Sequence, residues 1–311
     1  MISIAMTTYN GEKYLRNQLD SILNQSISDF ELVICDDCSK DSTREILKDY
    51  ANRDSRIKII LNESNLGFKR NFEKAILNCS GDYIALSDQD DIWEKEHLQI
   101  LMKTIGTNML TCGDSQCFIE NDGQMKDIFK LSELEFDLSV LKSNEDILKR
   151  IFFRGNPYQG AAMLMKKEFL DIVLPIPTDI SFHDVWFALC AACNNSFVYV
   201  NEIVNNYRQH ETQVTSHVKR NLFQKILRMP KFETIASDRE FYAFHLMEHL
   251  ENYPENIQIL INFVLEFYRN RKNKIYRWKK YSFYMKYIFP YLYKNTTKLN
   301  QLSRKIQYMF F

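Results

Sequence analysis

The sequence predicts an α/β fold in which helices cover both faces of a mainly parallel sheet, followed by a helical region at the C-terminal end. Two observations predict the sheet: strand and helix patterns alternate over the first hundred residues, and each predicted strand ends in polar residues. A third predicts the helical region, because glycine is absent beyond residue 221 and apolar residues recur there at helical spacing.

Short apolar runs and helical patterns follow one another from the first residues onward. Regular alternation of this kind favours parallel strands joined by helices. The expected strands are 2–6, 30–35, 57–61 and 83–86, and the expected helices are 14–23, 42–50 and 68–77. Residues 106–220 contain short mixed segments, and the clearest element among them is a helix that begins near Asp184.

Polar side chains follow the strands of the predicted sheet. Thr7 and Tyr9 follow the first strand, Asp36 and Asp37 follow the second, and Asp88 begins a group after the fourth. Ligands of parallel α/β sheets bind beyond the carboxyl ends of the strands. The sequence therefore predicts a binding site along this edge of the sheet.

The group after the fourth strand contains three aspartates, Asp88, Asp90 and Asp91. Carboxylates this close repel one another unless a cation lies between them, and oxygen ligands favour Mg²⁺ or Mn²⁺ over zinc. The alternative is an acidic turn that caps a helix starting near Trp93. Capping explains one aspartate but not three, so a metal site is favoured.

Asp36 and Asp37 form a second acidic pair at a strand end. Their carboxylates are suited to recognising a nucleoside, by accepting hydrogen bonds from a base N–H or a ribose hydroxyl. The alternative is capping of the next helix through Asp41 and Ser42. The pair alone does not decide between these two interpretations.

The cysteines and the first residues bear on the compartment. The first ten residues carry no charged segment of an export signal, and no apolar run approaches the roughly 18 residues that span a bilayer. Seven cysteines then favour reduced thiols in the cytosol. Two C-x-x-C pairs, Cys35–Cys38 and Cys190–Cys193, are far apart in the sequence, which favours coincidental pairs over a zinc site.

Four ordered motifs resemble the family 2 glycosyltransferases, which have the GT-A fold, a Rossmann-like fold with a mixed, mainly parallel sheet. The motifs are "TTYNGEKYLRNQLDSILNQ", "ELVICDDCSKDST", "NLGFKRNFEKAI" and "GDYIALSDQDDIW". The resemblance is dense over residues 2–105 and resumes at "HDVW" (183–186) and "YRQHETQ" (207–213). This set of motifs is most similar to bacterial rhamnosyltransferase-type enzymes that build surface polysaccharides.

The resemblance implies roles for residues on the donor side. Thr7 and Tyr9 would line the nucleobase, and Asp37 would bond the base or the ribose. Arg70 would approach the diphosphate of a nucleotide-diphosphate sugar, a dTDP- or UDP-sugar.

The resemblance also implies a metal site and a catalytic base. Asp88-Gln89-Asp90 matches the family's DxD motif, with Asp90 as the main contact to Mn²⁺ or Mg²⁺ and Asp88 facing the metal or the ribose. Asp184 matches the base that takes the proton from the acceptor hydroxyl. A direct displacement of this kind inverts the anomeric carbon, as in glycoside hydrolysis by a single displacement.

The sequence departs from the family pattern in two places. Cys38 stands where many members have glycine, which requires only that the turn avoid a positive φ. His183 stands where many members have Glu before the base. His183 and Trp186 are candidate contacts to the acceptor or the diphosphate. Arg208 and His210 are further candidates, and Arg208 is the better phosphate partner because its guanidinium is a permanent, bidentate cation.

Two other functions fit parts of the pattern. A nucleotidyltransferase would share the sheet and the paired aspartates, but it needs a glycine-rich phosphate loop, and "TTYNGEKY" contains only Gly11. A non-catalytic module that binds sugar nucleotides or a membrane is the alternative outside the enzymes.

Three parts of the chain are expected. Residues 1–105 would bind the nucleotide sugar, 106–220 the acceptor, and 221–311 would form a basic, aromatic helical region. All 40 acidic residues but only 28 of the 40 basic residues precede Arg269. A basic and aromatic tail suits an anionic membrane surface, and so predicts a peripheral protein on the inner face of the cell membrane that acts on a lipid-linked saccharide. A packed helical layer is the alternative, and nucleic acid is not expected.

Overall fold

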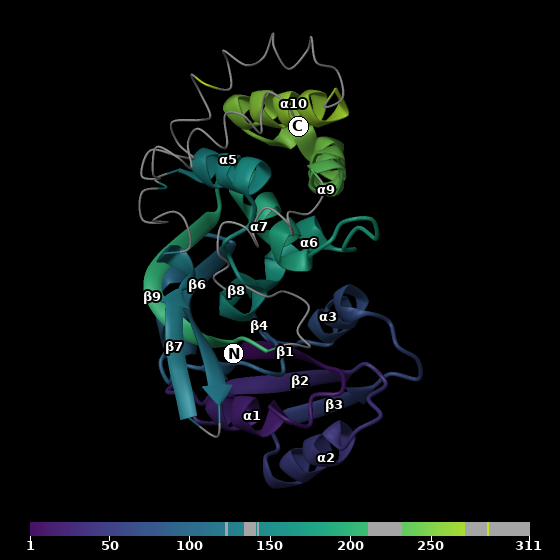
Figure 1. Cartoon of the computed structure of the whole chain (residues 1–311), viewed down its shortest axis with the longest axis vertical. Helices are drawn as coiled ribbons and strands as arrows, with labels where there is room; N and C mark the ends of the chain where they lie inside the picture. The colour runs from purple at the N-terminus through teal and green to yellow at the C-terminus, as the bar shows by residue number, and fades with distance from the viewer. Residues whose placement is uncertain (122–123, 134–140, 142, 211–231, 271–284, 286–311) are drawn as a thin grey trace.

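The computed structural model describes residues 1–121, 124–133, 141, 143–210, 232–270 and 285 (Figure 1). Within these residues nine strands form one sheet. Their order is β3 (Ile57–Leu61), β2 (Phe30–Asp36), β1 (Ile2–Thr8), β4 (Tyr83–Ser87), β8 (Met163–Lys166), β6 (Leu110–Asn121), β9 (Phe197–Arg208) and β5 (Ile92–Trp93), and β7 (Gln124–Lys130) pairs with β6.

The first four strands are parallel, with β1 between β2 and β4 and β3 outside β2. Their connecting helices are α1 (Leu15–Leu23), α2 (Thr43–Arg53) and α3 (Phe68–Leu77). Figure 1 shows α1 and α2 on one side of these strands and α3 on the other. The expected alternation is confirmed, and the strand at 57–61 and the helix at 68–77 have the predicted bounds.

The apolar runs form strands because both faces of the sheet are covered. Ile84, Ala85 and Leu86 in β4 are fully buried, as are Ile4, Ala5 and Met6 in β1. A near-continuous run of buried residues is typical of a strand inside a parallel sheet. The polar residues that follow each run then lie at one edge.

The second half of the sheet is mixed. β8 is antiparallel to β4 and β6, β6 is parallel to β9, and β5 and β7 are antiparallel to their neighbours. Strands from the expected ranges 1–105 and 106–220 therefore belong to one continuous sheet. The boundary at residue 105 stays a prediction.

Several helices accompany the second half of the sheet. They are α4 (His97–Ile105), α5 (Asn144–Arg154), α6 (Leu170–Val173) and α7 (His183–Cys193). All residues of α7 are buried except Asp184 and Val185. A helix that is apolar on nearly all sides belongs in a core, and the helix predicted near Asp184 is thus confirmed. All seven cysteines are free thiols.

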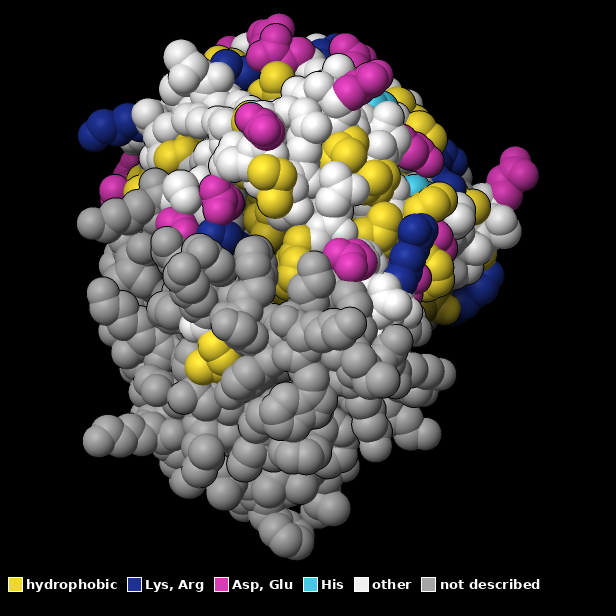
Figure 2. Space-filling view, turned by 90° about the horizontal axis from the view of Figure 1, so that it is seen from above, with side chains coloured by type: hydrophobic (Ala, Val, Ile, Leu, Met, Phe, Trp, Pro, Cys, Tyr) yellow, Lys and Arg dark blue, Asp and Glu magenta, His cyan; other side chains and the backbone are white. Residues whose placement is uncertain are grey.

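The described part of the C-terminal region, residues 232–270, is helical, as expected, with α9 (Phe232–Leu246) and α10 (Glu255–Arg269) packed together at one end of the molecule (Figure 1). Viewed from this end, hydrophobic side chains lie among acidic and basic ones on the part of the surface that the structure describes (Figure 2). Among the side chains of these two helices that the structure describes, Phe241, Phe244 and Ile259 are the large exposed hydrophobic ones.

The membrane prediction rests on a tail that the structure does not describe. Between Asn270 and the last residue only Met285 belongs to the described part of the chain, so the expected tail helix and its lipid contact stay predictions. In the described ranges no helix has the length and apolar character needed to cross a bilayer.

Candidate functional site

The loop after β1 and the acidic loop after β4 are joined by one side-chain amide. The backbone N–H of Tyr9 donates to Oε1 of Gln89 at 2.8 Å, and Nε2 of Gln89 donates to the carbonyl oxygen of Tyr9 at 3.0 Å. A Cβ atom on Gly11 would lie 2.2 Å from Oε1 of Gln89. Gly11 is therefore required for this close approach, and the Tyr9 ring stays 48% exposed above it.

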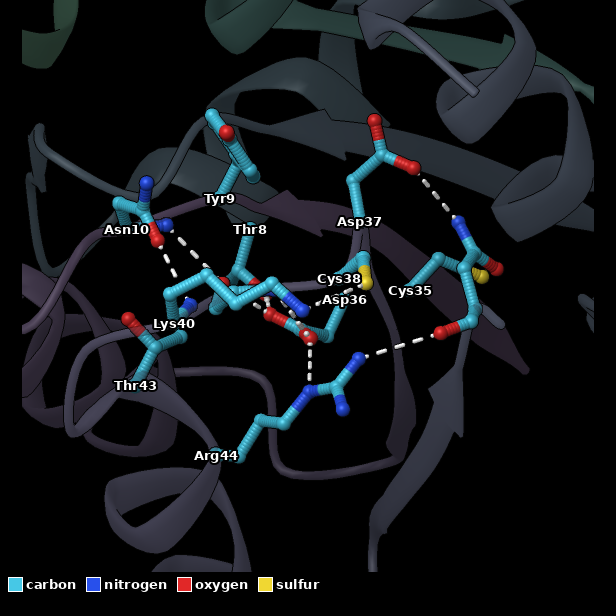
Figure 3. Close-up of polar contacts among 12 residues, drawn as sticks. Thr8, Tyr9, Asn10, Cys35, Asp36, Asp37, Cys38, Lys40, Thr43 and Arg44 are labelled. Atoms are coloured by element: carbon cyan, nitrogen blue, oxygen red, sulfur yellow. Dashed lines mark hydrogen bonds and ion pairs between the residues drawn. The ribbon is translucent and has the colours of Figure 1, made fainter. Parts of the chain in front are cut away.

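Asp36 is wholly buried at the end of β2 and is surrounded by donors from its own fold (Figure 3). Its carboxylate accepts hydrogen bonds from the Thr8 hydroxyl at 3.0 Å and from the Ser39 hydroxyl. It also forms an ion pair with Nε of Arg44 at 2.6 Å. These contacts tie the loops after β1 and β2 together. Asp36 thus supports the edge from inside, and a direct contact to a nucleotide stays a prediction.

Asp37 points to a different side from Asp36 (Figure 3) and holds the loop before α3. Its two carboxylate oxygens accept the backbone N–H groups of Leu66 at 2.7 Å and Gly67 at 2.9 Å, and Nδ2 of Asn62 at 2.9 Å. Thr7 lies near the end of β1 with 9% of its surface exposed. The backbone N–H of Asp37 donates to the carbonyl oxygen of Thr8 at 2.8 Å, so the ends of β1 and β2, which carry Thr7, Tyr9 and Asp37, lie side by side at the predicted edge.

The expectation for Cys38 is wrong. Its φ is +68°, in the left-handed region that favours glycine, whereas the sequence suggested a turn with negative φ. The residues on both sides of Cys38 are held by other contacts, since the N–H of Asp37 bonds the carbonyl oxygen of Thr8 at 2.8 Å and the N–H of Ser39 bonds the Asp36 carboxylate at 3.1 Å. Nζ of Lys40 lies 3.4 Å from the Cys38 sulfur (Figure 3).

The acidic loop carries three carboxylates with different surroundings. Burial and the negative charges of Asp90 and Asp184 raise the pKa of Asp88 to about 7. The pKa of Asp91 is also raised by burial and by Asp90 and Asp88, although Asn205 and the backbone N–H of Arg208 bond its oxygens at 2.8 Å and 3.2 Å. Asp90 lies 2.8 Å from Nε2 of His210.

Arg208 is buried and contacts the acidic loop through its side chain. Its Nε donates to the carbonyl oxygen of Asp90 at 2.8 Å, its Nη1 pairs with Glu120, and its guanidinium lies between the rings of Tyr14 and Phe118, at 4.5 Å and 4.7 Å. Its side chain is only 1% exposed. Contact between Arg208 and a phosphate stays a prediction, because in this structure the guanidinium faces protein on all these sides.

Asp184 lies in the first turn of α7, and its charge interacts with that of Asp88. Its Oδ1 accepts the backbone N–H of Val185 at 2.7 Å. Burial raises its pKa to about 6, although hydrogen bonds from the backbone N–H groups of Val185, Asp184 and Gly160 lower it. A Cβ atom on Gly160 would lie 3.5 Å from Cβ of Asp184, so the Gly160 backbone lies next to the Asp184 side chain.

His183 and Trp186 are both buried. Both ring nitrogens of His183 are buried without a hydrogen-bond partner among the described residues, and the ring packs 4.3 Å from that of Phe72. Burial and the charge of Lys69 lower the His183 pKa to about 3, so the imidazole is neutral. Nε1 of Trp186 donates to the carbonyl oxygen of Val173 at 2.9 Å, and the ring is 4% exposed, which gives Trp186 a packing role.

Arg70 lies in the first turn of α3, away from the acidic loop in sequence and partly in solvent. Its Nη1 pairs with Glu73 at 2.5 Å, and its side chain is 40% exposed. Its predicted contact to a diphosphate stays a prediction.

The carboxylates fit a hard divalent cation that keeps other ligands. In the part of the chain that the structure describes, no group of three or more His, Cys, Asp or Glu side chains is arranged to enclose a metal ion. Mg²⁺ and Mn²⁺ bound with a nucleotide need only one or two carboxylates, because water and phosphate oxygens complete the shell. Asp88 and Asp90 are the predicted pair, and their role as metal ligands stays a prediction; the pKa of Asp88 is raised first by burial and then by the charges of Asp90 and Asp184.

In the sequence, Gln89 is only the middle residue of the Asp88-Gln89-Asp90 motif, and no pattern points to a role for Gly160. The paired contact of Gln89 with Tyr9 depends on residues eighty positions apart. A signal existed only for Gly11, since a glycine after a strand end often marks a close approach.

Comparison with protein families finds a match to the model of glycosyl transferase family 2 over residues 3–170. An uncharacterized glycosyltransferase, MJ1057, of Methanocaldococcus jannaschii is 30% identical over 217 residues, which is 67% of this chain and 70% of that protein. A putative teichuronic acid biosynthesis glycosyltransferase, TuaG, of Bacillus subtilis is 37% identical over 99 residues, 32% of this chain. This match spans only 39% of TuaG.

A third relative has a more specific name. WfgD of Escherichia coli, a UDP-Glc:alpha-D-GlcNAc-diphosphoundecaprenol beta-1,3-glucosyltransferase, is 38% identical over 104 residues, which is 33% of this chain and 40% of that protein.

Two solved structures are similar over nearly the whole chain. S. aureus TarS 1–349 in complex with UDP-GlcNAc matches with a TM-score of 0.60 and 20% identity, covering 99% of this chain and 81% of that one. The mannosyltransferase PcManGT from Pyrobaculum calidifontis, in complex with GDP-Man and Mn²⁺, matches with a TM-score of 0.53 and 14% identity, covering 99% and 87%. At these identities the likeness concerns the fold, and the predicted GT-A architecture is confirmed.

Proposed function

This chain belongs to glycosyl transferase family 2, and from that premise we propose that it moves a sugar from a nucleotide-diphosphate donor to a hydroxyl group of a saccharide acceptor. The displacement is direct and inverts the configuration at the anomeric carbon. The donor is a UDP- or dTDP-sugar.

One observation carries the proposal: a carboxylate with a pKa raised to about 6, Asp184, faces the acidic loop at the carboxyl edge of the sheet. A base with such a pKa is largely ionised at neutral pH and accepts a proton more readily than an ordinary aspartate. Asp184 takes the proton from the acceptor hydroxyl as its oxygen bonds to the anomeric carbon. The bond from that carbon to the donor phosphate breaks, and the nucleoside diphosphate leaves.

The donor nucleoside lies against Thr7, Tyr9 and Asp37, which the loops after β1 and β2 bring together. The exposed ring of Tyr9 offers a face for stacking with a base. Asp36 contributes through the bonds that fix these loops, and Arg70 approaches the diphosphate. TarS, which shares the fold and was solved in complex with UDP-GlcNAc, supports a UDP-sugar as the first donor to test.

Asp88 and Asp90 hold Mn²⁺ or Mg²⁺, a choice supported by PcManGT, which shares the fold and was solved in complex with GDP-Man and Mn²⁺. When bound, the cation neutralises charge on the leaving diphosphate. The chain's own contribution is to hold both carboxylates in place, through Arg208 under the loop and Gln89 across it. His210, bonded to Asp90, lies beside the same group.

The acceptor is a lipid-linked saccharide in the synthesis of a bacterial surface polysaccharide, and the protein works at the inner face of the membrane. The names of WfgD and TuaG support this class of acceptor and product. A rhamnosyl donor would be dTDP-linked. Stabilisation of the protein by dTDP and not by UDP would distinguish this case. The basic tail beyond Arg269 would hold the active site at an anionic membrane surface.

The first test is thermal stabilisation of the protein by UDP, dTDP, GDP and CMP, each with and without Mn²⁺. A ligand at about 100 times its Kd stabilises a fold by about 2.7 kcal/mol. We expect one diphosphate to raise the Tm in the presence of Mn²⁺, and we expect Asp90→Ala to lose this shift while Asp171→Ala, an exposed aspartate on α6, keeps it. If no nucleotide raises the Tm of the wild-type protein, the donor site is rejected.

Transfer itself is tested with Asp184→Asn. The variant should bind the same nucleotide and lose about 10²–10⁴-fold in kcat, because a positioned general base contributes this much. For the wild-type protein, kcat should fall about tenfold per pH unit below pH 6, where Asp184 becomes protonated. Full transfer by Asp184→Asn would contradict the assignment of the base.

A further inference from the structure

Helix α7 begins without a capping side chain of its own. Its N-cap residue is Phe182, with φ −136° and ψ 136°, and a phenyl ring accepts no conventional hydrogen bond from the free N–H groups of a first turn. Asp184 lies inside that turn and bonds the N–H of Val185, its neighbour in the same turn. The N-cap residue therefore does not fix the start of α7 through its own side chain.

Helix α9 contacts the backbone just before this turn. The Tyr242 hydroxyl accepts the N–H of Phe182 at 2.8 Å and donates to its carbonyl oxygen at 2.9 Å. Asp238 accepts the N–H of Ser181 at 3.0 Å, and Nε2 of His245 lies 2.7 Å from Asp179. Asp238, Tyr242 and His245 are spaced four and three residues apart, so they share one face of α9.

Tyr242 is the buried centre of this face. It is only 1% exposed, and burial raises the pKa of its hydroxyl, which therefore stays protonated and keeps both hydrogen bonds. Figure 1 shows α9 beside α6 and α7, at the end of the molecule opposite α2.

Helix α3 also contacts the residues that precede α7, at positions 176–180. Nζ of Lys69 bonds the carbonyl oxygen of Thr178 at 2.8 Å and that of Ile180, and Glu73 accepts the N–H of Ile176 at 3.1 Å. Residues 176–182 are thus bonded to α3 and to α9. They lead directly into the turn that carries Asp184.

We propose that α9 completes the active site by fixing the start of α7, and that Tyr242 is a positioning residue for the general base Asp184. The inference rests on the proposed function, since it assigns Asp184 as that base. It gives the C-terminal helical region a role in catalysis that is separate from any contact with a membrane. Small displacements of a base cost rate steeply, because proton transfer needs the reacting atoms within hydrogen-bond reach.

The test is Tyr242→Phe, which removes the hydroxyl and keeps the ring. We expect kcat to fall at least tenfold, the donor KM to stay within twofold, and the acid limb of the kcat–pH profile to move. The amide of Phe182 should exchange with solvent at least fivefold faster, since it loses its acceptor. Wild-type kcat in this variant, or unchanged exchange at Phe182, would overturn the inference.

Tyr253→Phe is the matched control. Tyr253 is also buried in the C-terminal region, at 4% exposure, but its hydroxyl has no hydrogen-bond partner among the described residues. This variant should leave kcat and the exchange at Phe182 unchanged, so an equal loss of kcat in it would also overturn the inference. Asp238→Ala, at a more exposed position, is a second variant if Tyr242→Phe folds poorly, and it should speed exchange at Ser181 and lower kcat.

The two proposals fail in different ways. If the wild-type protein transfers no sugar from any of the four nucleotide classes, the proposed function is lost, and amide exchange at Phe182 then decides whether Tyr242 holds the start of α7. If the wild-type protein transfers sugar and Tyr242→Phe does so equally well, only the positioning role is lost.

Discussion

The carboxylates of Asp88, Asp91 and Asp184 lie close together in poorly solvated positions at the carboxyl edge of the sheet. The pKa of each is raised first by burial and then, for Asp88 and Asp91, by the neighbouring negative charges. Groups with strongly perturbed pKa values gather at functional sites, because chemistry often needs charges that folding alone would avoid. The edge is therefore expected to lower the stability of the ligand-free protein.

Asp88→Asn should stabilise the ligand-free protein by roughly 1–3 kcal/mol above pH 7. The folded carboxyl titrates at about 7 and the unfolded one near 3.8, so the folded state binds the extra proton between these values. The wild-type penalty is complete above pH 7, shrinks as the pH falls, and disappears near pH 4. Denaturant unfolding of both proteins at several pH values measures this difference.

The same substitution should abolish the Mn²⁺-dependent part of nucleotide binding. Asp171→Asn, at an exposed position, is the control and should change neither stability nor binding. Lower stability of Asp88→Asn than of the wild-type protein at pH 8 would contradict the charge argument.

At the scale of elements, the loops after β1, β2 and β4 form one hydrogen-bonded unit. Besides the Tyr9–Gln89 pair, the N–H of Asn10 donates to the Ser39 hydroxyl at 2.9 Å, and the N–H of Gly11 donates to the Thr43 hydroxyl at 2.8 Å. Such mutual bonding holds an edge in one arrangement before a ligand arrives, which lowers the entropy lost on binding.

Cys38→Gly should stabilise the fold by about 0.5–1 kcal/mol. The cysteine holds φ at +68°, which costs an L-residue roughly 1–2 kcal/mol, and the greater freedom of glycine in the unfolded chain offsets part of the gain. Denaturant unfolding checks the change. Cys38→Ala keeps the strain and removes the sulfur, so it should show no gain; equal stabilisation by both substitutions would point to the side chain instead of the turn.

For the whole molecule, the dominant feature is the separation of charge. The chain is neutral overall, yet residues before Arg269 hold every acidic side chain and 28 of the 40 basic ones. A body of net negative charge is repelled by an anionic bilayer, whereas a basic tail is attracted to it. This arrangement would orient the molecule with the C-terminal region toward the membrane.

The full chain should bind vesicles that contain anionic lipid and should be released by salt. Replacing four basic tail residues by Gln should weaken this binding at least tenfold, because each basic group near the surface contributes about 1 kcal/mol. The four are Arg271, Lys272, Lys279 and Lys280. Vesicle co-sedimentation measures the change.

Four exposed lysines of the body provide the control for charge alone. They are Lys48, Lys95, Lys103 and Lys126. Replacing all four of these lysines by Gln should leave vesicle binding nearly unchanged. Equal weakening by the two sets would show that binding follows net charge and not the tail.

The sequence by itself determined the parallel half of the sheet, the C-terminal helices and the place of the site. Periodic apolar residues decide which segments form strands and helices, and parallel strands bring their polar ends to one edge. The strand at 57–61 and the helix at 68–77 were predicted to the residue for this reason. The four motifs indicated the family and the candidate site residues.

Only the tertiary structure decided how those residues share the work. It put Arg208 under the acidic loop, gave Cys38 a positive φ, paired Gln89 with Tyr9 and set α9 against the start of α7. Each of these contacts joins segments far apart in the sequence or depends on a turn that several contacts fix together. Local patterns carry no record of such partners, because burial and hydrogen bonding are settled only when the whole chain has packed.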